Sequence, residues 1–137
     1  MATRSRIALQ LTDDSFLSVY HHWDGYPEWL GFTLNKKFNT RDKVAELIDG
    51  GDMSSCDSDS VYDYEKQAFV KRDPKPEYYN DTRGEKTEPR LDLSFEDYVE
   101  KNEEYAYVYT LDHEWECFKL YGDKPVKVTI PADYPQR

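Results

Sequence analysis

The fold is decided by residues 6–22, RIALQLTDDSFLSVYHH. Residues 6–11 and 15–22 are rich in β-branched and aromatic side chains, which favour β-strands. A short polar turn, Thr12-Asp13-Asp14, lies between them. Two such runs joined by a few polar residues predict a β-hairpin, and this hairpin would open a sheet.

Three helices are predicted after this hairpin. We expect a helix over residues 28–38, because Pro27 suits a first helical turn. Thr40 is a good N-cap for a second helix over residues 41–49. The apolar side chains of that segment recur on one face, at Val44, Leu47 and Ile48. A third helix is predicted over residues 95–102, where the start resembles a capping box.

A second hairpin is predicted near the end of the chain. Residues 105–110 and 115–121 alternate apolar and polar side chains, and a short polar turn connects them. Residues 126–130 predict a last edge strand, and Pro131 ends it.

The middle of the chain predicts two loops around one short strand. Residues 53–60 and 73–77 are polar or proline-rich, which is typical of loops, while residues 67–71 favour a strand. The whole pattern indicates an α+β fold, with two to three helices packed on one face of a mostly antiparallel sheet. A length of 137 residues fits one domain, in which we expect residues 130–137 to form a loose tail.

The chain is strongly acidic, with a formal net charge of −10. Residues 1–72 carry 9 basic and 12 acidic side chains, while residues 73–137 carry 9 and 16. The negative charge repels phosphates and anionic membranes, so we expect neither nucleic-acid nor membrane binding. Because the acidic excess is smaller in residues 1–72, we expect any anion site in that half of the chain. The two cysteines, Cys56 and Cys117, lie in different segments and predict free thiols in a reducing cytoplasm.

The segment from Tyr20 to Pro27 combines imidazoles, a carboxylate and aromatic rings at a strand end, where ligand sites collect. Alternation along the strand places Tyr20 and His22 on one face and His21 on the other. Arg4, Arg6 and Arg83 could form a fork for an anion, with an aromatic ring stacked on a base. The predicted ligand site is therefore Arg4, Arg6, Tyr20, His22, Trp23, Asp24 and Arg83.

Two other interpretations stay open. His22 and Asp24, with the distant His113, match the order of an iron triad, so a small hydrolase or metal enzyme centred on His22 and Asp24 is one alternative. The second is a DNA mimic, in which the carboxylates between Glu96 and Glu116 imitate phosphates and occupy a basic groove of a partner. No metal site of close paired Cys and His spacing is present in the sequence, and no cofactor is expected.

Several motifs resemble a family of small phage proteins to which no reaction is assigned. The motifs are MATRSRI at residues 1–7, VYHHWDGYP at 19–27, GDMSS at 51–55, DTRGE at 81–85 and YAYVY at 105–109. The resemblance implies a viral origin, expression in a bacterial host, and a role in disarming host defence or redirecting host machinery.

These observations predict a binding protein rather than an enzyme. We expect it to act in the host cytoplasm during host takeover or counter-defence, where it sequesters an anionic, nucleotide-like ligand or inhibits a host defence protein. The partner is then a host protein or a small anionic ligand, and self-association is left open.

Overall fold

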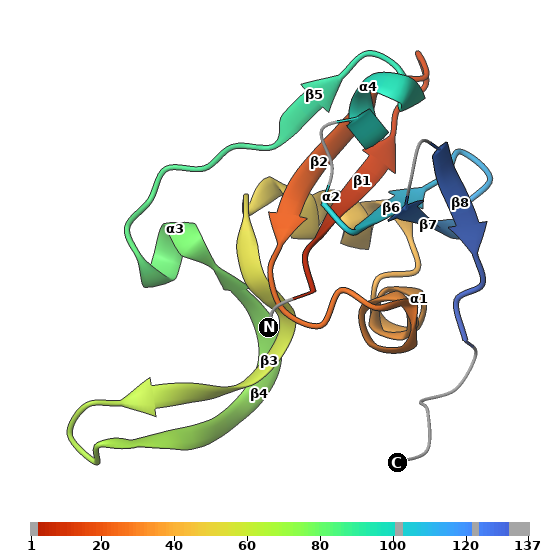
Figure 1. The fold of residues 1–137 in the computed structure, drawn as a ribbon. Helices are drawn as coiled ribbons and strands as arrows, with labels where there is room; N and C mark the ends of the chain where they lie inside the picture. Colours follow the sequence, from red (N-terminus) through yellow and green to blue (C-terminus); the bar gives the residue numbers. More distant parts are fainter. Residues whose placement is uncertain (1–2, 101–102, 122–123, 132–137) are drawn as a thin grey trace.

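The computed structural model describes residues 3–100, 103–121 and 124–131 and contains one mixed sheet with short helices around it (Figure 1). The strands are β1 (Ser5–Gln10), β2 (Phe16–His21), β3 (Met53–Asp63), β4 (Ala68–Tyr78), β5 (Arg90–Asp92), β6 (Tyr105–Tyr109), β7 (Trp115–Tyr121) and β8 (Lys124–Val128). The helical segments are a π-helix η1 (Pro27–Gly31) and the α-helices α1 (Phe32–Lys37), α2 (Arg41–Asp49), α3 (Tyr79–Thr82) and α4 (Phe95–Glu100).

The α+β class is confirmed, but the sheet is mixed rather than mostly antiparallel. Its order is β4-β3-β2-β1-β6-β7-β8, and β5 adds to β2. The two predicted hairpins, β1–β2 and β6–β7, are both present. The remaining edge of β1 pairs with β6 in parallel, and β2 meets β3 in parallel through His21 and Met53. Parallel partners are joined by long crossovers, which leave no local turn signal in the sequence.

The expectation that helices cover only one face is wrong, because the sheet has a core on each face. Successive residues of β1 and β6 point to opposite sides, so Ile7 and Tyr107 face one core while Ala8 and Ala106 face the other. The first core packs against η1, α1 and α2. The second packs against α4, whose Tyr98 is fully buried. The described chain also has more helical segments than the two to three expected.

The predicted helices form with adjusted ends. The segment over 28–38 begins as η1 at Pro27 and continues as α1. The helix over 41–49 is confirmed, and the Thr40 hydroxyl accepts a hydrogen bond from the Lys43 amide, as an N-cap does. In the described residues α4 ends at Glu100, and residues 101–102 of the expected helix lie outside them.

The C-terminal strand β8 begins and ends two residues earlier than predicted. Of the expected loose tail, only Ile130 and Pro131 belong to the described residues. No helix in the described part of the chain is long and apolar enough to cross a membrane.

Residues 53–60 and 73–77 were expected as loops but belong to a long β-hairpin of β3 and β4, which projects from one end of the sheet (Figure 1). Only its base is well packed, at Met53 and Cys56 among the described side chains. Polar residues are tolerated beyond the base because the antiparallel partner satisfies the backbone. Pro74 and Pro76 fit because β4 lies at the edge of the sheet.

Aromatic side chains of β6 and β7 tie the helical layer to the sheet through polar atoms. The Tyr109 hydroxyl donates to the Asn39 carbonyl at 3.1 Å, and Trp115 Nε1 donates to the Phe38 carbonyl at 2.8 Å. The Tyr107 hydroxyl donates to the Gly25 carbonyl at 2.7 Å in a fully buried contact. Each bond satisfies a carbonyl just outside a regular element, which burial would otherwise penalise.

We expect Tyr107→Phe to lower the free energy of unfolding by about 1–3 kcal/mol, because it leaves the buried Gly25 carbonyl without its donor. Chemical denaturation measures this loss. The control is Tyr26→Phe, since Tyr26 is 40% exposed and should change stability little. Equal stabilities of the two variants would contradict a structural role for the Tyr107 hydroxyl.

Candidate functional site

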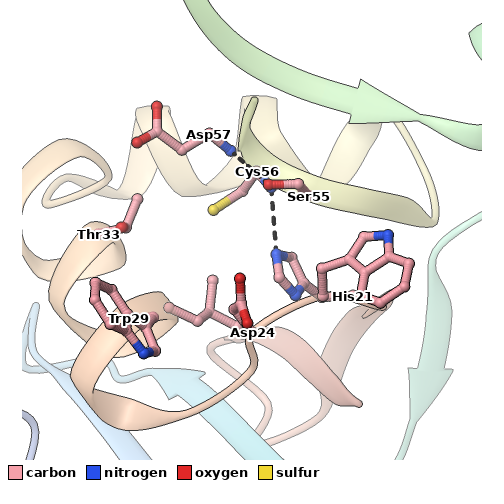
Figure 2. A pocket seen from close by; sticks show the side chains of 9 residues that line it. His21, Asp24, Trp29, Thr33, Ser55, Cys56 and Asp57 are labelled. Carbon is pink, nitrogen blue, oxygen red and sulfur yellow. Dashed lines mark hydrogen bonds between the residues drawn. The ribbon is translucent and has the colours of Figure 1, made fainter. Parts of the chain in front are cut away.

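A pocket of about 380 Å³ lies where the end of β2 meets η1, α1 and the start of β3 (Figure 2). Backbone hydrogen bonds bring these segments together, because the amides of His22 and Trp23 donate to the carbonyls of Met53 and Ser54. The pocket is lined by His21, Trp23, Asp24, Trp29, Leu30, Thr33, Ser55, Cys56 and Asp57.

His21 is a buried, neutral imidazole in the pocket wall, with only 2% of its surface exposed. Its Nε2 accepts a hydrogen bond from the Cys56 amide at 3.2 Å, so the proton of the neutral ring is on Nδ1. Burial, with the neighbouring His22 as a second cause, lowers the pKa of His21 to about 3. Within the described part of the chain, Nδ1 has no hydrogen-bond partner.

Asp24 places a carboxylate in the pocket. Its backbone has a φ of 53°, in the left-handed region that Asp and Asn tolerate better than other residues. This conformation ends the extended chain and directs the side chain among the other labelled residues of Figure 2. No ion pair or hydrogen bond to this carboxylate occurs among the described residues. The carboxylate of Asp57, by contrast, lies 2.8 Å from Lys37 Nζ.

Cys56 contributes a protonated thiol to the pocket. Its burial, with Asp57 as the next cause, raises the pKa of the thiol to about 12. A thiol must ionise to act as a nucleophile, and the neutral His21 does not supply the positive charge that would favour a thiolate. The Cys56 thiol is therefore not activated as a nucleophile at neutral pH. Both cysteines of the chain are free and buried.

The predicted site residues separate into two groups. Trp23 and Asp24 line the pocket. Tyr20 and His22 share the opposite strand face, as alternation predicts, and the Tyr20 hydroxyl lies 2.6 Å from His22 Nδ1. The rings of His22 and Trp23 meet edge to face, with centroids 4.6 Å apart, so Trp23 stands between the pocket and the Tyr20–His22 pair.

The three predicted arginines do not line the pocket. Arg4 is exposed and lies 4.0 Å from the Glu103 carboxylate. Arg6 is buried and donates to the hydroxyl and the carbonyl of Ser18. Burial, followed by repulsion from Arg90, lowers its pKa. Arg83 lies over the Tyr79 ring, with its guanidinium carbon 4.4 Å from the centroid.

The residues that sequence reasoning missed are the buried His21 and the pocket residues from η1, α1 and β3. Alternation correctly separated His21 from His22. The buried Met53 and Cys56 in an otherwise polar segment were the one signal that residues 53–60 pack against the domain.

In residues 3–100, 103–121 and 124–131, no group of three or more His, Cys, Asp or Glu side chains is placed to hold a metal.

We expect Gly25→Ala to destabilise the turn that forms the pocket. A Cβ at Gly25 would lie 2.7 Å from the Thr3 carbonyl oxygen and 2.9 Å from Ser5 Cβ, so the backbone must shift. The expected loss is about 1–3 kcal/mol in denaturant unfolding. Gly84→Asn is the control, because its site is open and Asn tolerates the φ of +64°. A Gly25→Ala variant as stable as the control would contradict this close packing.

His21 should make the stability depend on pH. Because its pKa falls from 6.5 to about 3 on folding, the unfolded chain binds a proton that the native protein excludes between these values. The contribution is complete above pH 6.5 and is lost as the pH falls toward 3, by at most about 1.4 kcal/mol per pH unit. Urea unfolding at several pH values should show a weaker pH dependence for His21→Gln than for wild type or for the exposed variant His113→Gln. Identical dependence in all three proteins would contradict a buried neutral imidazole.

No protein-family model, curated protein or solved structure matches this chain. We therefore infer a function from the geometry and chemistry of the pocket and of the surfaces around it.

Proposed function

We propose that the chain is a small phage-type binding protein that acts in the host cytoplasm during host takeover or counter-defence. It inhibits a host defence protein by docking the face that carries the pocket at His21, Trp23 and Asp24. The observation that carries this proposal is the pocket itself, which combines an unpaired carboxylate, two indoles and a neutral imidazole.

The properties of the pocket favour binding over catalysis. Its volume of about 380 Å³ falls in the range of roughly 300–1,000 Å³ that is usual for ligand sites. Its lining mixes aromatic side chains with a few polar groups, which is also usual for such sites. An imidazole with a pKa near 3 is a poor proton acceptor at neutral pH, and a thiol with a pKa near 12 is a poor nucleophile.

A nucleotide-like anion is a second candidate ligand, supported by the Tyr20–His22 pair. Arg4 is one residue before Ser5, which pairs with His21, so it lies near His22 across the strands. Tyr20 and Arg4 also interact electrostatically. Glu103 competes for Arg4, however, and the described residues that line the pocket include two carboxylates and no arginine or lysine. The charges therefore favour a protein partner at the pocket over an anion.

Affinity capture from host cells tests the proposal. We expect tagged wild-type protein to retain a specific host protein and Trp23→Ala to lose it, because half-exposed Trp23 forms part of the docking face. Leu93→Ala is the matched control, since Leu93 is a large exposed apolar side chain outside the pocket lining. Quantitative mass spectrometry of the captured proteins gives the readout, and thermal unfolding verifies that all three proteins are folded.

The same variants connect binding to biology. Wild type and Leu93→Ala should impair the function of the captured host protein when expressed in the bacterium, and Trp23→Ala should not. Retention of the same host protein by Trp23→Ala would contradict the pocket face as the docking site.

A further inference from the structure

We propose that the pocket accepts a basic side chain, arginine or lysine, from the partner protein. This inference rests on the proposed function and specifies the chemistry that the pocket recognises. The Asp24 carboxylate pairs with the positive charge, while Trp23 and Trp29 contact the cation and its aliphatic stem.

The first support is the charge balance inside the pocket. Asp57 is already neutralised by Lys37 at 2.8 Å. The imidazole of His21 is uncharged, because its backbone hydrogen bond and its burial both favour the neutral ring. Asp24 is therefore the one lining charge without a compensating partner among the described residues. A cationic guest would balance that charge, whereas an anionic guest would add to it.

The second support is the aromatic content of the lining. Trp23 and Trp29 both belong to the pocket, and Figure 2 shows Trp29 on the side opposite His21. Indole is the ring that attracts cations most strongly, through the negative face of its π-system. A carboxylate beside indoles suits a guanidinium in particular, because that planar group can form a bidentate bond to a carboxylate and stack on a ring. An ammonium group would use the same carboxylate as a point charge.

The third support is the charge of the whole protein. A formal net charge of −10 attracts basic surfaces and raises the rate at which a basic partner arrives. Long-range attraction alone gives little selectivity, so a pocket that accepts one basic side chain would fix the register of the two proteins. The same field opposes an anionic ligand at this position.

Titration with small model compounds tests the inference on the isolated protein. The probes are N-acetyl-arginine amide and N-acetyl-lysine amide, with N-acetyl-citrulline amide as the uncharged isostere of arginine and AMP as the anion. We expect at least one basic probe to bind at the pocket and the citrulline probe to bind at least about tenfold more weakly. Chemical-shift changes in NMR spectra give both the affinity and the location.

Asp24→Asn is the decisive variant, because Asn also tolerates the left-handed backbone at this position. It should bind the basic probes at least about tenfold more weakly than wild type, whereas the exposed variant Asp112→Asn should bind them equally well. Equal binding of arginine and citrulline probes, unchanged binding by Asp24→Asn, or AMP as the preferred pocket ligand would each overturn the inference.

The inference and the proposed function fail in different ways. If Trp23→Ala loses the host partner while Asp24→Asn retains it at full affinity, the pocket face docks the partner without reading a basic side chain. That result overturns the inference and leaves the proposed function standing. If both variants retain the partner, the proposed function itself is overturned.

Discussion

The Tyr107 hydroxyl, in the middle of a central strand, donates a hydrogen bond to the Gly25 carbonyl at 2.7 Å. The pocket depends on this contact, because Gly25 directly follows the pocket residues Trp23 and Asp24. Burial raises the pKa of Tyr107, so the phenol stays protonated and remains a donor. The amide of Gly25 donates in turn to Thr3, and a Cβ on Gly31 would lie 3.3 Å from the Tyr107 ring. The turn after β2 is therefore held from several directions, and it presents Trp23 and Asp24 at a fixed position.

Short-range sequence patterns correctly predicted the hairpins and the helix whose formation depends on residues close together in the chain. The β1–β2 and β6–β7 hairpins and the helix capped by Thr40 all form where short-range signals placed them. The parallel contacts of β1 with β6 and of β2 with β3 have no such signal, because their partners are far apart in sequence. The polar composition of residues 53–60 is typical of a loop, but these residues belong to a strand whose backbone pairs with β4.

The candidate site was predictable in part for the same reason. The segment from Tyr20 to Pro27 does contribute Trp23 and Asp24 to the pocket. Sequence reasoning chose His22, which bonds to Tyr20, while the fold buries His21 in the pocket wall. The hydrogen-bond partner of His21 is the Cys56 amide, which the parallel β2–β3 contact places beside it. The sequence carries no local signal for that contact. The sequence also does not reveal which carboxylates are paired in the fold. Asp57 forms an ion pair with Lys37, whereas Asp24 has no such partner among the described residues.

The chain has three tryptophans, and their indole N–H signals in an NMR spectrum provide the most direct measurement. Trp23 and Trp29 line the pocket, whereas Trp115 Nε1 is bonded to the Phe38 carbonyl in the core. When the captured host protein is added, we expect the signals of Trp23 and Trp29 to shift and the signal of Trp115 to stay in place. Unchanged Trp23 and Trp29 signals in a formed complex would contradict the claim that this pocket is the binding site.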